Sequence, residues 1–190
     1  MTAEVVPATR GVGPLLQRDY WAVFSDCTLR PSEVMAHVKA HFCSLPPATL
    51  VEFTISGDIA PDAELDILIK PTQQCRARVI HVDAQSLTLA TLAGHPEAGR
   101  ITFGCYRNPA GELVFHIRSR ARAASTPHLI GFLALGEAMQ TNTWTDFISS
   151  AALAVGARVR DIIHADTQCV EELPDDDEPL RRPTYAAVGD

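Results

Sequence analysis

The sequence lacks the features that mark membrane-spanning, secreted and disulfide-stabilised proteins. No stretch approaches the roughly 18 consecutive apolar residues that a membrane-spanning helix needs. The amino terminus has no basic segment followed by an apolar core, so we expect no secretory signal. The five cysteines are odd in number and none stands in a CxxC pair, which favours free thiols in a reducing cytoplasm. They are Cys27, Cys43, Cys75, Cys105 and Cys169.

Motifs for common cofactors and nucleophiles are also missing. There is no phosphate loop, no dinucleotide-binding fingerprint, no GxSxG turn and no HExxH helix. The seven histidines are scattered, and only His37 and His41 have the spacing that would place two imidazoles on one helix face. Nothing else around this pair resembles a metal site. We therefore expect no bound metal and no cofactor.

The charge is unevenly distributed along the chain. The net charge is −7, but the segment Glu171–Asp190 alone carries −5, from seven acidic residues and two arginines. The remainder is close to neutral and offers no basic footprint for nucleic acid, so we expect none to bind. The composition of residues 169–190 predicts an acidic, disordered tail.

Short apolar runs separated by turn residues occupy the first two thirds of the chain. In each run apolar and polar side chains alternate, which is typical of strands with one buried face. A helix that opens at Pro31 follows the first run, and an Asn108–Gly111 turn joins the last two runs as a hairpin. Six or seven strands at a spacing of about 10 residues predict an antiparallel meander. The runs are 18–25, 49–56, 65–70, 75–83, 86–93, 100–107 and 112–122.

A long apolar segment with helical spacing follows the strands. It begins at Thr126-Pro127, a typical helix start, and extends to Gly156. The polar stretch 140–143 predicts a kink or break in its middle, and residues 158–165 are expected to continue as helix. A curved sheet closed by this helix would enclose a cavity for a small molecule.

The last predicted strand has two contrasting faces. One face is apolar and is expected to pack inward, while the other carries a row of basic side chains. An antiparallel sheet permits one wet face, so we interpret this row as solvated; an anion-binding patch is the alternative. The basic row is His116, Arg118, Arg120 and Arg122.

Several short stretches between residues 75 and 155 are distinctive. The most specific is the loop Thr91–Gly99, TLAGHPEAG, which follows the strand CRARVIHVD at 75–83. A hairpin, a strand with Ser119-Arg120 and a helix with an internal Gln140 come after it. In these stretches the chain resembles uncharacterised protein family 0548, a domain of unknown function.

The resemblance is to a divergent member, because the sequence departs from the family pattern at Arg100-Ile101 and at Ala121. It implies the START-like helix-grip fold of lipid-transfer domains, birch-pollen-allergen-like proteins and aromatase/cyclases. The expected fold is α+β: a curved antiparallel sheet of about six or seven strands wrapped on a long C-terminal helix, with a hydrophobic cavity between them. One domain is expected at 17–168, preceded by an irregular arm at 1–16.

The segment His95-Pro96-Glu97 is the strongest candidate for acid–base chemistry. An imidazole and a carboxylate two residues apart at a cavity mouth can share proton transfer, each tuning the pKa of the other. Asp146, on the predicted helix, is a third catalytic candidate if the protein is an enzyme. The alternative is a turn in which His95 caps backbone groups and Pro96 fixes the geometry.

A second set of residues is expected to line the cavity and bind the ligand. A few convergent polar groups among apolar and aromatic walls are typical of a ligand site. The alternatives are plain core for the aromatic residues and a water-facing helix break for the polar ones. The candidates are Thr91, Phe103, Phe115, Ser119, Gln140 and Trp144.

Three functions follow from these expectations. We favour the binding of a small hydrophobic ligand without chemistry. The alternative is a cofactor-free enzyme, such as a cyclase, dehydratase or isomerase, that acts on a polyketide- or terpenoid-like substrate by acid–base chemistry in the same cavity. A protein-interaction role for the acidic tail is the third. The sequence leaves the ligand and the oligomeric state open.

Overall fold

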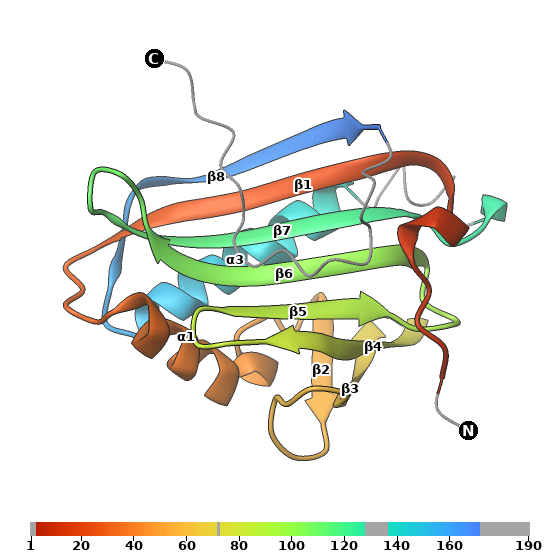
Figure 1. The fold of residues 1–190 in the computed structure, drawn as a ribbon, viewed down its shortest axis with the longest axis horizontal. Coiled ribbons are helices and arrows are strands. Elements are labelled where there is room, and N and C mark those ends of the chain that lie inside the picture. The colour runs from red at the N-terminus through yellow and green to blue at the C-terminus, as the bar shows by residue number, and fades with distance from the viewer. Residues whose placement is uncertain (1–2, 72, 128–136, 172–190) are drawn as a thin grey trace.

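The computed structural model describes residues 3–71, 73–127 and 137–171. Its strands form one eight-stranded antiparallel sheet in the order β2-β3-β4-β5-β6-β7-β1-β8 (Figure 1). From β2 to β7, neighbouring strands are consecutive in the chain, as in the predicted meander. The strands are β1 (Val12–Ser25), β2 (Val51–Ile55), β3 (Glu64–Ile69), β4 (Gln73–Val82), β5 (Ser86–Thr91), β6 (Glu97–Arg107), β7 (Leu113–Ala123) and β8 (Arg158–Val170).

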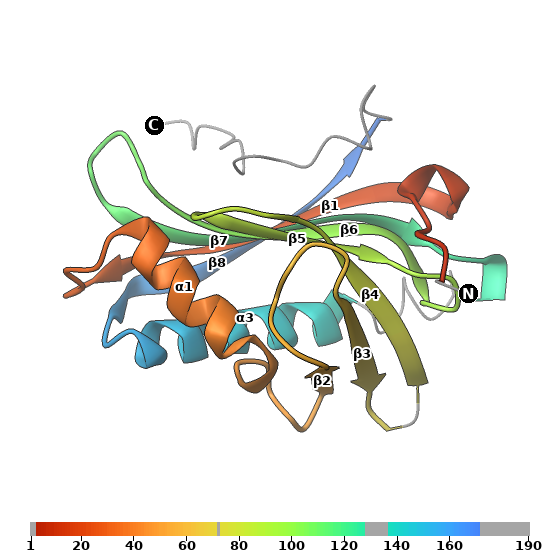
Figure 2. The same ribbon diagram turned by 60° about the horizontal axis from the view of Figure 1, so that its bottom comes forward.

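The helices α1 (Pro31–Ala40) and α3 (Glu137–Ala154) lie on the concave side of the curved sheet. Figure 2 shows β2, β3 and β4 turning down beside α3, so that the sheet wraps around this helix. The predicted α+β architecture, a curved antiparallel sheet with a C-terminal helix, is therefore confirmed. The sheet has eight strands, where six or seven were predicted.

Aromatic side chains fill one part of the space between the sheet and α3. The ring of Phe147 on α3 lies 5.2 Å from that of Phe103 on β6 and 6.3 Å from that of Phe115 on β7. Phe42, which follows α1, meets Phe103 edge-on at 5.0 Å. All four side chains are buried. Such pairs add about 1 kcal/mol each to the stabilisation from burial alone, so this end of the interface is solid core.

Strand β1 is longer than predicted, and the predicted irregular arm at 1–16 ends earlier. The strand already begins at Val12. Its pairing register with β7 shifts between Val12 and Leu16, and Gly13 has a φ of 81°. Glycine adopts this left-handed conformation without strain, so the Gly13-Pro14 pair creates a bulge in the strand and does not end it.

The prediction that residues 158–165 continue the helix is wrong. Helix α3 ends at Ala154, and Gly156 follows with a φ of 69°. The N–H of Ala157 then donates to the Ala152 carbonyl at 2.9 Å, a closure typical of helix ends at glycine. The chain reverses into β8, which pairs antiparallel with β1. The edge of β1 offers backbone hydrogen bonds that outweigh the local preference for helix, and β8 is the additional strand.

The predicted break at 140–143 is also wrong. Helix α3 runs through this stretch without interruption. Thr143 is buried, and Gln140 and Thr143 both line a cavity, so they face the sheet. The hydroxyl of Thr145 donates to the Thr141 carbonyl at 2.8 Å, which satisfies this polar side chain within the helix.

Two predicted segments lie outside the described residues: the first part of the long helix, at 128–136, and the acidic tail from residue 172. The sheet itself extends from Val12 to Val170, slightly beyond the predicted domain limits. Within the described part of the chain, no helix is both long and apolar enough to cross a membrane. The five cysteines are free thiols.

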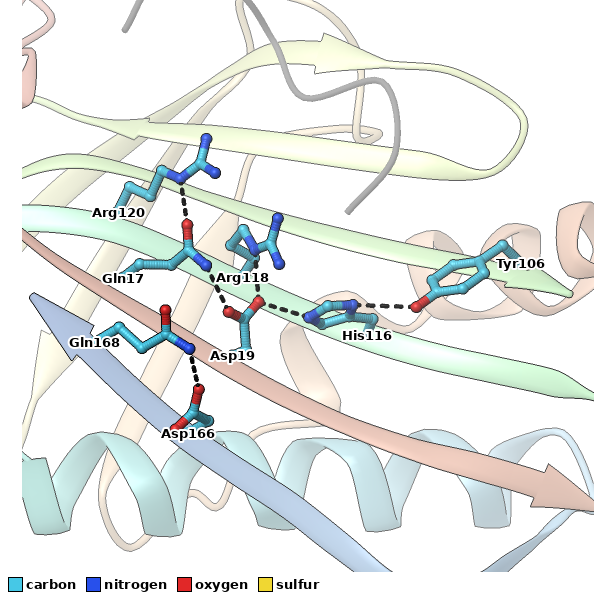
Figure 3. A network of polar contacts seen from close by, with 8 residues as sticks. All are labelled: Gln17, Asp19, Tyr106, His116, Arg118, Arg120, Asp166 and Gln168. Atoms are coloured by element: carbon cyan, nitrogen blue, oxygen red, sulfur yellow. Dashed lines mark hydrogen bonds and ion pairs between the residues drawn. The ribbon is translucent and has the colours of Figure 1, made fainter. Parts of the chain in front are cut away.

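The basic row on β7 is not solvated as predicted. It lies on the convex face of the sheet, which we call the outer face, but His116, Arg118 and Arg120 are only 2%, 4% and 9% exposed. Asp19 on β1 accepts hydrogen bonds from His116 Nε2 at 2.7 Å and from Arg118 Nε at 2.5 Å. Gln17 accepts one from Arg120 Nε at 2.8 Å (Figure 3). Acceptors on the neighbouring strand therefore compensate the buried donors.

Candidate functional site

A cavity of about 360 Å³ lies between α3 and the concave face of the sheet, beside the aromatic core. Its walls are mostly apolar and come from β2 to β7 and from one face of α3. This volume is within the range of natural small-molecule sites, about 300–1,000 Å³. Prominent apolar wall residues are Val51, Phe53, Ile67, Leu89, Ile101 and Trp144.

Side chains alternate between the two faces of each strand, and this alternation determines which residues face the cavity. Leu89 on β5 pairs with Ile101 on β6, which pairs with Ser119 on β7. On the other side, Ala77 on β4 pairs with Thr91 on β5. Cross-strand partners point to the same face of a sheet. Paired residues from neighbouring strands therefore lie side by side in the cavity wall.

One end of the cavity is polar. The Glu97 carboxylate accepts a short hydrogen bond from the Gln140 side-chain amide of α3. Arg18 Nη1, on β1, lies 3.7 Å from Glu97 Oε1, and Arg18 Nε lies 3.2 Å from Glu137 Oε2. The Arg18 side chain is fully buried. A guanidinium, two carboxylates and an amide thus meet where an otherwise apolar cavity ends.

Burial raises the pKa of Glu97 above its ordinary value of 4.5. The charge of Arg18 and the hydrogen bond from Gln140 oppose this rise, whereas the nearby Glu137 adds to it. Burial also raises the pKa of Tyr20, which follows Arg18 on the inward face, to about 12. The polar end therefore holds a carboxyl whose proton is retained to higher pH than usual, beside a phenol that stays protonated at neutral pH.

His95 lines the cavity next to Glu97, and its Nδ1 contacts the backbone of Glu97. His95 Nδ1 lies 3.0 Å from Glu97 N and 3.1 Å from the Glu97 carbonyl oxygen, so this ring nitrogen can cap either backbone group according to its tautomer. This is the capping geometry that the sequence offered as the alternative. The Glu97 carboxylate itself lies against Gln140 and Arg18.

The structure places the remaining predicted residues in three different environments. Thr91, Ser119, Gln140 and Trp144 line the cavity, and the Thr91 hydroxyl accepts a hydrogen bond from Gly99 N at 3.0 Å. Phe103 and Phe115 belong to the adjacent aromatic core and are completely buried. Asp146 is exposed on α3. Asp146 is not among the residues that line the cavity, so the structure does not place it where the proposed catalytic role would need it.

Sequence reasoning missed Arg18 and Glu137. The signal for Arg18 was present, since it is in phase with Tyr20, Ala22 and Phe24, which the strand pattern places on one face. A charged residue on a buried face is a candidate for function. Glu137 carries no comparable signal, because its role depends on how α3 docks beside β1.

The described residues were also compared with the requirements of a metal site and of a reactive thiol. Among the described residues, no group of three or more His, Cys, Asp or Glu side chains could hold a metal ion. Burial raises the pKa of both Cys75 and Cys105 to about 12, so these thiols are not nucleophilic at neutral pH.

No family model and no curated protein matches the chain. Solved structures match it in fold. The KanY protein aligns with a TM-score of 0.54 at 10% identity, covering 76% of this chain and 99% of that one. Norcoclaurine synthase from Thalictrum flavum, in complex with dopamine and hydroxybenzaldehyde, aligns with a TM-score of 0.53 at 12% identity, covering 82% and 93%.

The di-domain ARO/CYC protein StfQ of the steffimycin biosynthetic pathway aligns with a TM-score of 0.52 at 8% identity. The alignment covers 75% of this chain and 51% of StfQ, so the chain corresponds to about half of that protein. At these identities the likeness shows the fold alone. The fold is the helix-grip fold, with β8 added after the C-terminal helix.

Proposed function

We propose that this protein binds a small, largely apolar molecule in the cavity between the sheet and α3. The observation that carries the proposal is a cavity of about 360 Å³ with apolar walls and one polar end. Apolar walls favour transfer of a hydrophobic ligand from water, and Glu97 and Gln140, which line the cavity, would orient one polar group of that ligand. Binding of dopamine and hydroxybenzaldehyde by norcoclaurine synthase gives a precedent for small ligands on this fold.

A cofactor-free enzyme is the second candidate, and the state of Glu97 favours it. A buried carboxyl with a raised pKa holds its proton to higher pH than an ordinary glutamate, which suits it to general acid–base chemistry. As a carboxylate, Glu97 would accept a proton from carbon or oxygen of the substrate, and as the protonated acid it would return that proton to the product. A cyclase, dehydratase or isomerase acting on a polyketide- or terpenoid-like substrate would use this chemistry.

Three finer assignments remain part of this proposal. Membership of uncharacterised protein family 0548 depends on the loop Thr91–Gly99 and the stretches around it. A cytoplasmic location is consistent with the free thiols. The acidic segment Glu171–Asp190 is a candidate for protein interaction because of its charge.

Tryptophan fluorescence tests the binding proposal. The chain has two tryptophans, Trp21 on β1 and Trp144 in the cavity wall, so the Trp21→Phe variant reports from the cavity alone. Titration with 1-aminoanthracene is expected to quench Trp144 with saturation at one probe per chain. A linear response without saturation would contradict the proposal.

A matched pair of variants locates the bound probe. Ala77 is buried in the cavity wall, and Ala77→Leu would fill part of the space. We expect its affinity for 1-aminoanthracene to fall about tenfold, or about 1.4 kcal/mol. Ala36 is exposed on α1, so Ala36→Leu is the control and should bind like the parent protein. Equal affinities in both variants would place the probe elsewhere.

The Glu97→Gln variant separates binding from catalysis. It keeps the shape of the side chain and one acceptor oxygen but removes the negative charge and the proton-transfer group. If the protein is a carrier, its natural ligand is bound and released unchanged by both forms. If it is an enzyme, Glu97→Gln still binds the substrate while turnover falls by roughly 100-fold or more, as for the loss of a general acid–base group.

A further inference from the structure

We infer that the ligand of the cavity is an uncharged molecule with a hydroxyl group on an otherwise apolar body. Ser119 on β7 and Gln140 and Trp144 on α3 would bind this hydroxyl group. The inference rests on the proposed function, because it names the chemical class of the molecule that the cavity binds.

Three buried polar atoms in the cavity wall have no hydrogen-bond partner among the residues that the structure describes. They are Ser119 Oγ, Gln140 Oε1 and Trp144 Nε1, and all three residues line the cavity. Buried polar groups in folded proteins are nearly always paired, because an unpaired group loses its hydrogen bonds to water and gains none in return. Three such atoms in one cavity wall indicate a ligand that supplies the partners.

The orientation of the Gln140 amide follows from its contact with Glu97. A carboxylate only accepts hydrogen bonds, so the amide nitrogen of Gln140 faces Glu97 and donates to it. This contact does not use the amide oxygen. A ligand atom that bonds Gln140 Oε1 must therefore be a hydrogen-bond donor.

Trp144 is held in place by aromatic packing and offers the opposite kind of group. Its ring meets that of Phe103 edge-on, with 5.6 Å between the centroids, and lies 6.4 Å from that of Phe53. The indole N–H only donates hydrogen bonds. Gln140 precedes Trp144 by one helical turn, so the two side chains are neighbours on one face of α3. This face thus presents an acceptor next to a donor.

Ser119 lies on the sheet opposite the same turn of α3. On β6, Ile101 is on the inward face between Glu97 and Phe103, which both contact this turn. Ile101 pairs directly with Ser119 on β7. Ser119 is only 3% exposed, and its neighbours on the inward face of its strand are apolar. A serine hydroxyl can donate or accept, so it can complete the hydrogen bonding of a ligand group held by α3.

The pattern of donors and acceptors distinguishes between the polar groups that a ligand could carry. A carbonyl or carboxylate oxygen accepts from Trp144 but leaves Gln140 Oε1 without a donor. An ammonium group donates to Gln140 but leaves Trp144 Nε1 without an acceptor. Of these groups, only a hydroxyl both donates and accepts, so one ligand oxygen satisfies both atoms of the helix.

The charges at the polar end of the cavity favour an uncharged ligand. The carboxylate of Glu97 would repel an anion, and Arg18 Nη1, 3.7 Å from Glu97 Oε1, would repel a cation. His95 Nδ1 is engaged with the backbone of Glu97. Arg100 also lines the cavity, but strand alternation directs its side chain to the outer face, because the next residue, Ile101, faces inward. Transfer of a charged group from water to apolar walls adds a further cost.

Displacement of 1-aminoanthracene from the full-length protein by matched naphthalenes tests this inference at neutral pH. The compounds are 2-naphthol, 2-methylnaphthalene, 2-naphthoate and 2-naphthylmethylammonium. We expect 2-naphthol to bind about tenfold more tightly than 2-methylnaphthalene, although the methyl compound is the more hydrophobic of the two. Both ions should bind more weakly than 2-naphthol. The ratio of the two Kd values, for 2-methylnaphthalene over 2-naphthol, is the hydroxyl preference.

Single substitutions assign the preference to residues. Ser119→Ala and Trp144→Phe each remove one hydrogen-bonding atom and keep most of the wall, and each should lower the hydroxyl preference about threefold. Ser149→Ala is the matched control for the first, because the Ser149 hydroxyl donates to the Thr145 carbonyl within α3. Trp21→Phe, on the outer face of β1, is the control for the second. Both controls should keep the preference of the parent protein.

The indole N–H signals of the parent protein give a second readout by NMR, which does not depend on the folding of any variant. The chain has two tryptophans, so both signals can be followed together. We expect the Trp144 signal to move further downfield with 2-naphthol than with 2-methylnaphthalene, because only 2-naphthol accepts a hydrogen bond from it. The Trp21 signal should not distinguish the two compounds.

The possible outcomes separate this inference from the proposed function. If 2-methylnaphthalene or either ion binds as tightly as 2-naphthol, the cavity binds ligands and only the inference is overturned. An unchanged hydroxyl preference in both Ser119→Ala and Trp144→Phe overturns it as well. If neither 1-aminoanthracene nor any naphthalene binds with saturation, the proposed function is overturned and the inference with it.

Discussion

Arg18 on β1 and Glu97 on β6 form an ion pair across the inward face of the sheet, with 3.7 Å between Arg18 Nη1 and Glu97 Oε1. Strand β7 lies between their two strands, so the pair bridges over it. Each residue alone would be costly to bury, and together they form the polar end of an apolar cavity. The first two predictions therefore change the charge of Arg18 or of Glu97 and measure the stability of the fold.

Removal of Arg18 should leave the buried Glu97 carboxylate without its ion-pair partner and so lower the free energy of unfolding. We expect Arg18→Met to destabilise the fold by about 3 kcal/mol at pH 8 and by less at pH 5, where Glu97 can take up a proton. Chemical denaturation at both pH values measures this. The double variant Arg18→Met/Glu97→Gln should regain part of the loss, and Arg30→Met, at an exposed ion pair, should change little. Equal losses at both pH values would contradict this account.

The raised pKa of Glu97 predicts a pH-dependent stability difference. Below its ordinary value of 4.5 the carboxyl is protonated in both folded and unfolded chains, so the parent and Glu97→Gln should be similarly stable. As the pH rises above 4.5, the unfolded chain ionises first, and the parent loses stability relative to the variant until the raised pKa is passed. Each unit of elevation corresponds to about 1.4 kcal/mol.

Glu64→Gln is the matched control, because the pKa of Glu64 is shifted in the opposite direction to that of Glu97. The hydrogen bond from Arg78 lowers the pKa of Glu64, so its carboxylate stabilises the fold above pH 4.5 and this contribution disappears as the pH falls. The parent should therefore gain stability over Glu64→Gln as the pH rises. Parallel slopes for the two variants would show that Glu97 is not desolvated as the structure indicates.

The outer-face network should depend on Asp19. Burial alone would raise its pKa, but hydrogen bonds from His116 and Arg118 lower it overall, so it is a carboxylate at neutral pH. Asp19→Ala would leave both donors without this acceptor and is expected to cost about 3 kcal/mol. Asp166, its partner on β8, is exposed and bonds Gln168. Asp166→Ala is the control, and a loss as large as that of Asp19→Ala would contradict the network.

Gly99 should be sensitive to a single added carbon. Its φ is 153°, and a Cβ there would lie 2.2 Å from the Arg120 carbonyl oxygen. Gly99→Ala therefore combines backbone strain with a clash and should destabilise by about 3 kcal/mol. Gly111 has a φ of 80° but open space around it, so Gly111→Ala should cost only about 1 kcal/mol. Thermal denaturation of the two variants compares them, and equal losses would argue against the close approach of β6 and β7.

Alternation and turn chemistry predicted most of the sheet because each strand from β2 to β7 pairs with its sequence neighbour. The two main errors, β8 and the unbroken α3, arise from tertiary contacts. Residues 158–165 become strand only because β1 offers an edge, and polar Gln140 stays helical because it reaches Glu97 on the sheet. Secondary-structure propensities describe only local sequence, so they could not predict either of these tertiary contacts.

The candidate site was predicted in part. The loop with His95 and Glu97 lines the cavity together with four of the six proposed ligand-binding residues. Asp146 was misplaced because helical phase could not be fixed within a segment so uniformly apolar. The importance of Arg18 was overlooked, although its place in the strand pattern marked it as a buried charge.

Native mass spectrometry of full-length protein purified from its own host tests the central claim most directly. The account predicts a complex of one small organic molecule per chain, released by organic extraction and replaced by one molecule of 1-aminoanthracene. A protein that has only the mass of its own chain, both as purified and after incubation with 1-aminoanthracene, would contradict the claim that this cavity binds a ligand.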